Sequence, residues 1–378
     1  MTRMSSTPAA KSIHRAARGD GRLRVLDRTA GVAVLAAAGA LKRRRRLPAE
    51  IRRIGILKST GIGDMTLLAG VARDVAAAYP DATVFLVAGR DNAEVARLVG
   101  GVEVVTVPIG EPIEAIRRLR ELRLDVLLDF GQWTRVEAIC SFLSGARFTI
   151  GFETPGQRRH YCYDTTVRHS GDVHELENYR RLAGSLGVES TTVPKLGEAR
   201  SNGWKPAAPP FVVFHLWPGG YRSELKEWPL ESWRDLAARL VERGYSIVLT
   251  GAAEDAERTE DFVRSCQGLE GRVENAAGRY ALSELVELLG RASCVVSVNT
   301  GVMHLAAASG APTVALNGPT SEARWGPIGD RVRSVNADLP GCGYLNLGFE
   351  YDRGRTDCMR AISVDRVADA VFSLVGDE

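Results

Sequence analysis

The sequence predicts an α/β protein made of two halves, each a doubly wound parallel sheet, and three observations support this. From residue 53 onward, short aliphatic and β-branched runs alternate with helical stretches, which is typical of parallel strands covered by helices on both faces. The alternation stops near residue 155 and resumes after residue 210. The chain of 378 residues is long enough for two domains. Such sheets bind ligands beyond the carboxyl ends of their strands, so we expect the halves to face a central cleft.

The first half is expected to span residues 51–205. Apolar runs predict strands at 53–57, 83–88, 102–107, 125–130 and 147–152, with helices between most of them. A helix is predicted from the first loop to about Tyr79-Pro80, and another over 174–188. The polar stretch 191–210 is rich in proline and glycine, so it is predicted to link the two halves.

The second half is expected to span residues 206–360, and a C-terminal helix lies within 361–378. Apolar runs predict strands at 211–216, 246–251, 295–298 and 312–316. Helices are predicted at 231–243, 254–265, 282–290, after Thr300, and at 364–375.

The leading segment, residues 1–50, carries most of the basic character of the chain. It holds twelve Lys and Arg against three Asp and Glu, although the net charge of the whole chain is only +3. The remainder is therefore net acidic, which argues against a nucleic-acid-binding protein. The apolar stretch 29–41 would form a helix of about 20 Å, too short for a hydrocarbon core of about 30 Å. Residues 22–46 are expected to lie on the anionic inner face of the cytoplasmic membrane. The alternative is a frayed, solvated extension of a cytoplasmic protein.

The six cysteines are scattered and form no C-x-x-C pair, which argues against a zinc ribbon or a thioredoxin-like motif. Cys342 and Cys358 share a loop-rich segment near the C-terminus. We expect two free thiols there, as in a reducing cytosol, and the alternatives are a disulfide or a shared metal.

The first loop with functional potential, KSTGIGD at 58–64, joins the first strand to the first helix. Gly61 and Gly63 allow a ligand to approach the backbone. The third glycine of a dinucleotide fingerprint is missing, and the chain has no P-loop motif. Asp64 has two interpretations: a carboxylate that stabilises the helix start, or a general base that faces the cleft.

Two loops of the second half suit the parts of a nucleotide. Gly219 and Gly220 open the backbone, and Lys226 follows them at a strand end, which suits a phosphate. One strand later, Asp255 or Glu254 is placed to accept hydrogen bonds from ribose hydroxyls. The alternatives are a solvated lysine and two acids that the helix dipole favours.

The triplet Asn299-Thr300-Gly301 lies between a buried strand and a helix. The free N–H groups at a helix start bind anions, and Thr300 adds a hydroxyl while Gly301 permits close approach. His304 lies one turn further on and is predicted to point the same way as Thr300. The alternative for His304 is a packed core histidine.

Taken together, four stretches resemble glycosyltransferase family 9, which includes the bacterial ADP-heptose:lipopolysaccharide heptosyltransferases. They are RIGILKSTGIGDMTLLAGVARDVAAAYPDATVFLVAG (53–89), DFGQWTRVEAICSFLSGARFTIGF (129–152), KEWPLESWRDLAARLVERGYSIVLTGAAED (226–255) and VNTGVMHLAAASGAPTVALNGPT (298–320). The resemblance covers roughly residues 53–375. It implies a GT-B fold, in which two Rossmann-like domains face a central cleft and the second binds the nucleotide-sugar.

The resemblance also implies roles for individual residues. Asp64 is implied as the catalytic base, Lys226 as a contact of the donor phosphates and Asp255 as a contact of the ribose. Thr300, Gly301 and His304 are implied at the diphosphate. The family inverts the anomeric centre and needs no metal held by a D-x-D motif, and no D-x-D is present in this sequence.

The acceptor is expected to meet the first half. Gly61 and Gly63 lie in its first loop, and Arg135, Arg158 and Arg159 lie in other loops, where they suit an anionic glycolipid. The alternative is that these are ordinary surface arginines.

The expected function is transfer of a sugar, most simply heptose from ADP-heptose, to a lipopolysaccharide core or related acceptor, without cofactor or metal. Two positions depart from the family pattern. Asn299 stands where the family usually has Asp, and Asn317 stands where an aromatic residue usually precedes Gly-Pro-Thr. Asn299 therefore leaves the identity of the donor sugar open. The alternatives are a nucleotide-sugar epimerase or other GT-B protein without transferase activity, and a nicotinamide-dependent oxidoreductase.

Overall fold

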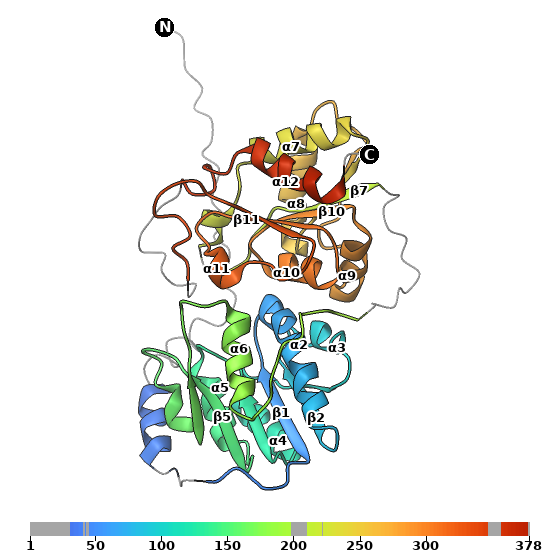
Figure 1. Cartoon of the computed structure of the whole chain (residues 1–378). Coiled ribbons are helices and arrows are strands. Elements are labelled where there is room, and N and C mark those ends of the chain that lie inside the picture. Colours follow the sequence, from blue (N-terminus) through green and yellow to red (C-terminus); the bar gives the residue numbers. More distant parts are fainter. Residues whose placement is uncertain are drawn as a thin grey trace.

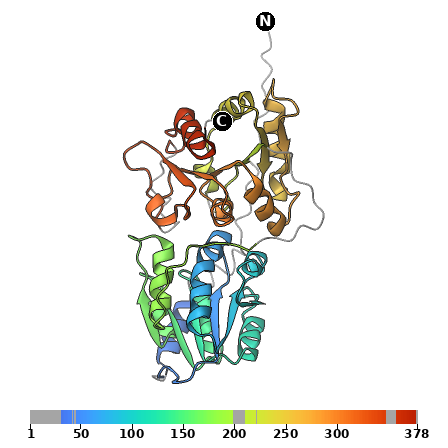
Figure 2. The same cartoon turned by 45° about the vertical axis from the view of Figure 1, so that its right-hand side comes forward.

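The computed structural model describes residues 31–40, 42, 45–197, 210–220, 222–346 and 357–376. The chain forms two stacked halves, the first coloured blue to green and the second yellow to red (Figures 1 and 2). The central part of the predicted linker, 198–209, lies outside the described residues, as does the part of the predicted membrane helix before residue 31.

The first half is built on a parallel sheet of six strands in the order β3-β2-β1-β4-β5-β6. The strands are β1 (Arg53–Lys58), β2 (Thr83–Ala88), β3 (Glu103–Thr106), β4 (Val126–Asp129), β5 (Phe148–Glu153) and β6 (Thr165–Arg168). The five strands predicted from apolar runs are confirmed. The sixth, TTVR, was not predicted, because it is a short edge strand with no fully buried residue.

Helices cover both faces of this sheet. They are α2 (Ile62–Ala78), α3 (Ala93–Arg97), α4 (Pro112–Glu121), α5 (Arg135–Leu143), the 3-10 turn η1 (Arg159–Cys162) and α6 (Glu175–Gly184). Helix α2 is buried along most of its length, because it packs on the sheet, on α6 and on α10 of the other half. The first loop therefore reaches the boundary between the halves.

The second half repeats this architecture. Its strands are β7 (Phe211–His215), β8 (Ser246–Thr250), β9 (Val273–Asn275), β10 (Cys294–Val298), β11 (Thr313–Asn317) and β12 (Val332–Asn336). They form a parallel sheet in the order β12-β11-β10-β7-β8-β9. Counted from its own first strand, this is the same order as in the first half, the Rossmann order. The chain therefore has two doubly wound sheets, as predicted.

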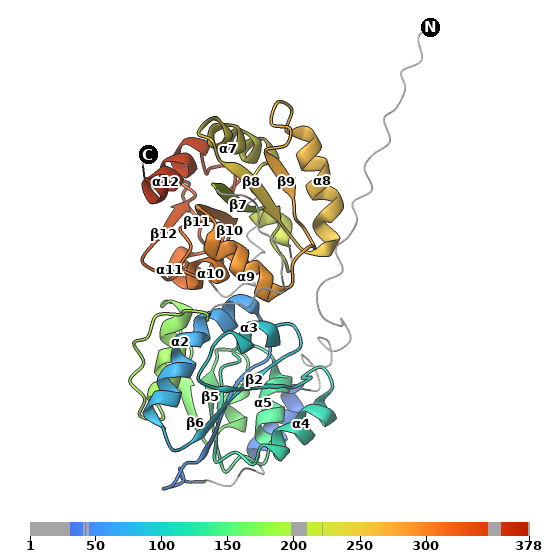
Figure 3. The same ribbon diagram turned by 90° about the vertical axis from the view of Figure 1, so that its right-hand side faces the viewer.

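The helices of the second half lie on both faces of its sheet (Figure 3). They are η2 (Ser223–Lys226), α7 (Leu230–Glu242), η3 (Ala253–Asp255), α8 (Ala256–Ser265), α9 (Leu282–Arg291), α10 (Gly301–Ala308), α11 (Glu322–Trp325) and α12 (Val364–Val375). The C-terminal helix α12 packs on α7 and on β10 to β12, and its Val367 and Val371 are fully buried in that core. It is part of the second half.

A helical segment, residues 31–40, lies against the first half. Its Leu35 and Ala38 are buried in a small cluster with Ala138, Cys162 and Tyr163. The buried face of this part of the apolar stretch therefore packs against the first half of the protein. Among the residues that the structure describes, none forms a helix long and apolar enough to cross a membrane.

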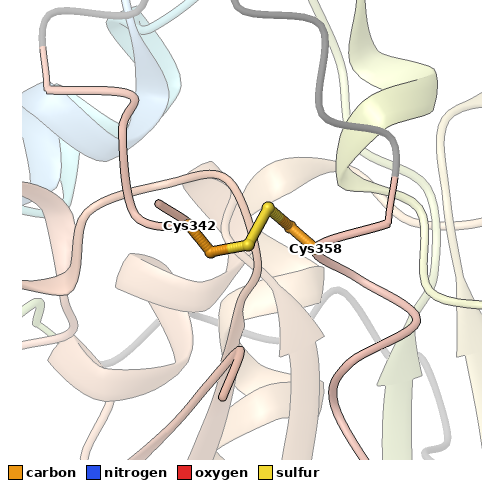
Figure 4. Close-up of a disulfide and its surroundings, with 2 residues drawn as sticks. All are labelled: Cys342 and Cys358. Atoms are coloured by element: carbon orange, nitrogen blue, oxygen red, sulfur yellow. A yellow bond between two sulfur atoms is a disulfide. The ribbon is translucent and has the colours of Figure 1, made fainter. Parts of the chain in front are cut away.

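A disulfide joins Cys342 to Cys358 (Figure 4). The prediction of two free thiols is therefore wrong, and the alternative of a disulfide holds. The sixteen-residue separation had left both outcomes open, because the distance between two loop cysteines depends on the fold around them. The other four cysteines are free and buried.

Candidate active site

The amino-terminal ends of α2 and α10 meet at the boundary between the halves. A Cβ atom on Gly63 would lie 2.7 Å from Cδ2 of His304, and one on Gly301 would lie 3.0 Å from Cβ of Ile62. Both glycines are thus needed for the helices to approach each other. We had expected these glycines to let a ligand approach the backbone. In the structure, each glycine instead lets a helix of the opposite half approach.

Asp64 lies in the first turn of α2 and is held by three donors on one oxygen. Its Oδ1 accepts hydrogen bonds from the Tyr179 hydroxyl at 2.6 Å and from Nε2 of Gln132 at 3.2 Å. Nζ of Lys58 lies 3.2 Å from the same oxygen. Lys58 also donates to Oε1 of Gln132 at 2.6 Å, which fixes the orientation of that amide. The carboxylate therefore has one defined position.

The surroundings of Asp64 set its pKa. Burial by itself would raise the pKa of this carboxyl. The positive charge of Lys58 and the hydrogen bonds from Tyr179 and Gln132 outweigh burial, and the pKa lies below its ordinary value of 3.8. Asp64 is therefore ionised at neutral pH.

A buried charge cluster lies beside Lys58. Asp129 and Arg159 form an ion pair of 3.0 Å, and both side chains are 0% exposed. Tyr163 donates to the second oxygen of Asp129 at 2.7 Å, and Glu137 lies 3.8 Å from Arg159. The prediction that Arg159 contacts an acceptor is wrong, because its guanidinium is enclosed and neutralised inside the first half. Sequence position alone had placed it in a loop.

The other two predicted acceptor arginines lie apart. Arg135 is 9% exposed at the start of α5, and its Cδ would lie 3.1 Å from a Cβ on Gly31 of the leading helix. Arg158 is exposed and adopts the left-handed conformation with φ 60°. Contact of either residue with an acceptor stays a prediction.

His304 points from α10 toward the first half and is buried. Burial and, to a smaller extent, the neighbouring His174 lower its pKa to about 3, although the charge of Asp64 acts in the opposite direction. The imidazole is therefore neutral at neutral pH. Its Nδ1 makes no hydrogen bond with the described part of the chain. A neutral imidazole offers a hydrogen bond to a diphosphate, not a positive charge.

The glycine loop after β7 lies at the same end of the sheet as the start of α10, because β7 and β10 are parallel neighbours. Gly220 has a φ of 97°, which only glycine adopts readily, and Nζ of Lys226 lies 3.5 Å from the Gly219 carbonyl. Lys226 thus folds back onto the glycine loop that follows β7. Thr300 is the N-cap of α10, and its hydroxyl makes no capping hydrogen bond to the N–H groups of the first turn. Binding of a phosphate by these residues stays a prediction.

Asp255 is 3% exposed, and both its oxygens are engaged. Oδ2 accepts from the Ala252 N–H at 2.9 Å, and Oδ1 accepts from Nη2 of Arg258 at 2.6 Å. This is the helix-start role that we gave as the alternative. Contact with a ribose stays a prediction for Asp255, and the exposed Glu254 of the same turn is the other candidate.

Asn299 makes contacts that an aspartate could not make. Its Nδ2 donates to Oδ1 of Asn317 at 2.9 Å and to the Trp325 carbonyl at 3.0 Å. A carboxylate has no N–H to donate. The two positions that depart from the family pattern are therefore hydrogen-bonded to each other.

Buried polar contacts join the halves near this site. Nη2 of Arg324 lies 2.6 Å from Oε2 of Glu175, with side chains 1% and 0% exposed. His174 caps α6 and its Nε2 lies 2.9 Å from the Gly326 carbonyl. We did not predict these residues, nor Lys58, Gln132 and Tyr179 around Asp64, because each acts through a partner distant in sequence. Lys58 alone gave a signal, as the first residue of the KSTGIGD loop.

No group of three or more His, Cys, Asp or Glu in the described ranges could hold a metal ion.

Two Rossmann-type domains that meet at an ionised carboxylate and an open helix start define the GT-B class of glycosyltransferase fold. The model of glycosyltransferase family 9 (heptosyltransferase) matches residues 113–342, which is more than half of the chain. The chain belongs to this family.

Individual relatives agree with this assignment. The chain is 38% identical over 138 residues to lipopolysaccharide heptosyltransferase 1 of Pseudomonas aeruginosa, covering 36% of each protein. It is 33% identical over 126 residues to lipooligosaccharide heptosyltransferase 2 of Haemophilus influenzae, covering 32% of this chain and 36% of that protein. These matches span about a third of each relative.

Solved structures share the fold over nearly the whole chain. The Escherichia coli ADP-heptose lps heptosyltransferase II superposes with a TM-score of 0.70 at 24% identity, covering 86% of this chain and 98% of that one. A family 9 glycosyltransferase from Veillonella parvula superposes with a TM-score of 0.73 at 18% identity, covering 87% and 98%. At these identities the likeness establishes the fold.

Proposed function

We propose that this protein is an inverting glycosyltransferase that moves heptose from ADP-heptose to a lipopolysaccharide core or a related glycolipid. The observation that carries the proposal is the meeting of an ionised, tightly held Asp64 with the open start of α10. Family membership and relatives named as heptosyltransferases support the choice of sugar. A solved structure of similar fold is an E. coli heptosyltransferase with ADP, which supports the choice of nucleotide.

Asp64 is proposed as the general base, through one particular oxygen. Oδ1 already receives three donors, whereas Oδ2 accepts no hydrogen bond from the described residues. Oδ2 lies over Gly61, where any Cβ would collide with it. Oδ2 would take the proton from the acceptor hydroxyl. The hydroxyl oxygen then attacks the anomeric carbon from the side opposite the diphosphate, and the bond from that carbon to the diphosphate breaks.

The leaving diphosphate gains negative charge as this bond breaks. The proposed stabilisers are the positive end of α10 at Thr300 and Gly301, the ammonium of Lys226, and a hydrogen bond from the neutral His304. Fixed dipoles and charges of this kind act at no reorganisation cost. The proposed mechanism uses no metal ion, and unchanged turnover in the presence of EDTA would be its direct consequence.

The acceptor is proposed to be membrane-borne, with the protein held at the inner membrane face. In the leading helix Leu35 and Ala38 face the protein, but Val34 is 44% exposed, and a basic run follows at 42–46. Basic clusters bind anionic lipid surfaces electrostatically. Replacing Arg43, Arg44 and Arg46 by Gln, while keeping Arg45 and its 2.8 Å ion pair with Asp164, should release the protein from anionic vesicles and leave the docked helix in place. Unchanged sedimentation with such vesicles would contradict this.

The test of the function has two stages. Thermal unfolding is first measured with ADP-, GDP- and UDP-sugars, because a ligand of the native state raises the melting temperature according to its affinity. The stabilising donor is then incubated with and without a heptose-deficient lipopolysaccharide, and the products are weighed by mass spectrometry. Acceptor-dependent gain of one sugar supports the proposal. Isomerised nucleotide-sugar formed without acceptor would instead support an epimerase.

A further inference from the structure

A cavity of about 200 Å³ lies at the carboxyl ends of β11 and β12. Asn317, the last residue of β11, and Asn336, the last of β12, both line it, with Thr320, Ser321 and Glu322 from the following segment. Its volume corresponds to about seven water molecules at roughly 30 Å³ each. This suits a group the size of one sugar ring.

Asn317 lines this cavity and has an unused hydrogen-bond donor. It is 1% exposed, and its Nδ2 donates no hydrogen bond to the described part of the chain. Burying a donor without a partner costs about 1–3 kcal/mol, so such a group marks a place where a partner is expected.

The orientation of this amide follows from a chain of hydrogen bonds. The Trp325 carbonyl can only accept, so the group of Asn299 that faces it must be Nδ2. The same Nδ2 donates to the Asn317 side chain, which must therefore present Oδ1. The free group of Asn317 is then its NH₂. Asn299 thus fixes which end of Asn317 is left for a ligand.

The cavity lies next in the row of strand ends that hold the proposed contacts of the donor. Neighbouring strands are about 4.8 Å apart, and the second sheet runs β8, β7, β10, β11, β12. The proposed ribose contact follows β8, and the proposed phosphate contacts follow β7 and β10. The next position along the strand ends is that of Asn317. A sugar attached to the diphosphate and pointing away from the nucleoside reaches this side of the sheet.

The cavity wall suits a neutral, hydroxyl-rich group. The NH₂ of Asn317 donates, the hydroxyls of Thr320 and Ser321 can donate or accept, and the carboxylate of Glu322 accepts. The negative charge of Glu322 disfavours an anionic ligand, since like charges repel at short range.

We propose that this cavity receives hydroxyl groups of the donor sugar and that Asn317, oriented by Asn299, recognises them. The inference rests on the proposed function and deepens it: the two asparagines together determine which donor sugar is bound. A single Asp at position 299 would remove both hydrogen bonds that Nδ2 donates, the one that orients Asn317 and the one that the Trp325 carbonyl accepts.

Binding of nucleotide-sugars and of their sugar-free nucleotides separates this idea from the proposed function. Affinities for ADP, ADP-heptose, ADP-glucose, UDP and UDP-glucose are measured by isothermal titration calorimetry. Asn317→Asp keeps an oxygen acceptor for Asn299, replaces the NH₂ by a second oxygen and adds a negative charge. It should weaken binding of the preferred nucleotide-sugar about 3- to 10-fold and leave the matching nucleoside diphosphate unchanged.

A second variant and a matched control complete the test. Ala337→Phe fills the cavity from its rim and should also weaken only the nucleotide-sugar. Asn275→Asp, at the end of β9 on the opposite edge of the sheet, should change neither affinity. The inference is overturned if both variants bind the nucleotide-sugar as wild type does, or if they weaken the nucleoside diphosphate equally. If wild-type protein binds no nucleotide, the proposed function itself fails.

Discussion

The two halves share one strand order but differ in the side chains that they bury at the point where that order reverses. In the first half, charged side chains are buried around the point where the strand order reverses, between β1 and β4: Lys58, Asp129, Glu137 and Arg159 are at most 3% exposed. At the equivalent point of the second half, between β7 and β10, the buried polar side chains include His215, Thr250 and Ser297. His215 bonds to the Thr250 hydroxyl at 3.0 Å, a pair without a carboxylate.

The difference shows how one fold supports two tasks. Buried charges are tolerated only when they are paired, and pairing fixes their geometry. The first half uses this to hold Asp64 in one position and in its ionised form. The second half instead offers glycines and free N–H groups at the start of α10, which suit a ligand that brings its own negative charge. In the proposed function, the same position on the sheet provides catalysis in one half and binding in the other.

The largest expected effect is the loss of the base in the first half. Asp64→Asn keeps the size of the side chain but removes the charge that accepts a proton. The kcat for transfer should fall about 10²- to 10⁴-fold, whereas the Kd for the donor should stay as in wild type. Steady-state kinetics and calorimetry measure the two quantities. Asp81→Asn, at an exposed position of the same half, is the control. Wild-type turnover in Asp64→Asn would remove Asp64 from this role.

The next effect concerns the ion pair that joins the halves. Arg324→Leu leaves Glu175 buried without its cation, which should lower the free energy of unfolding by about 3–5 kcal/mol, as read from urea denaturation. The double variant Arg324→Leu with Glu175→Leu removes both charges and should recover part of the loss. Arg239→Leu breaks an exposed pair with Asp365 and should cost at most about 1 kcal/mol. Equal losses in Arg324→Leu and Arg239→Leu would show that the interface pair contributes no more to the free energy of unfolding than the exposed pair does.

A smaller effect is expected in the binding half. Lys226→Ala removes one cation from the proposed phosphate site, so the affinity for ADP should fall about 10- to 150-fold, the range for a hydrogen bond to a charged group. Lys195→Ala removes an exposed lysine of the first half and should change nothing. If the two variants bind ADP equally well in calorimetry, Lys226 does not contact the phosphates.

The fold was predictable wherever strands are buried on both faces. The continuous apolar runs of β1, β2 and β8 predicted these strands. The periodic pattern of residues 364–375 predicted helix α12 with the same bounds that the structure has, Val364–Val375. Strand β12 (VRSVN) was missed because only one of its five residues is buried. An edge strand with polar side chains has no periodic signal that distinguishes it from a loop.

The candidate site was predictable only where it is local in sequence. Asp64 follows a strand and a glycine loop within a few residues, and Thr300-Gly301 likewise marks a helix start. The hydroxyl of Tyr179 reaches Asp64 across 115 positions, and Arg324 reaches Glu175 across 149. Such contacts depend on how the two halves dock. The helix-to-helix role of Gly63 was hidden for the same reason.

The smallest expected effect is a shift in a pH profile. Lys58 is the main charge that lowers the pKa of Asp64, so Lys58→Met should raise that pKa toward or above its ordinary value. The base works only when ionised, and the acid limb of kcat/KM should therefore move to higher pH. The stability that Asp64 gains from its lowered pKa is present above its unfolded pKa and is lost as the pH falls through the folded pKa, and this gain should shrink in the variant. An acid limb that stays in place, or moves to lower pH, would show that Lys58 supports the packing around Asp64 without controlling its charge.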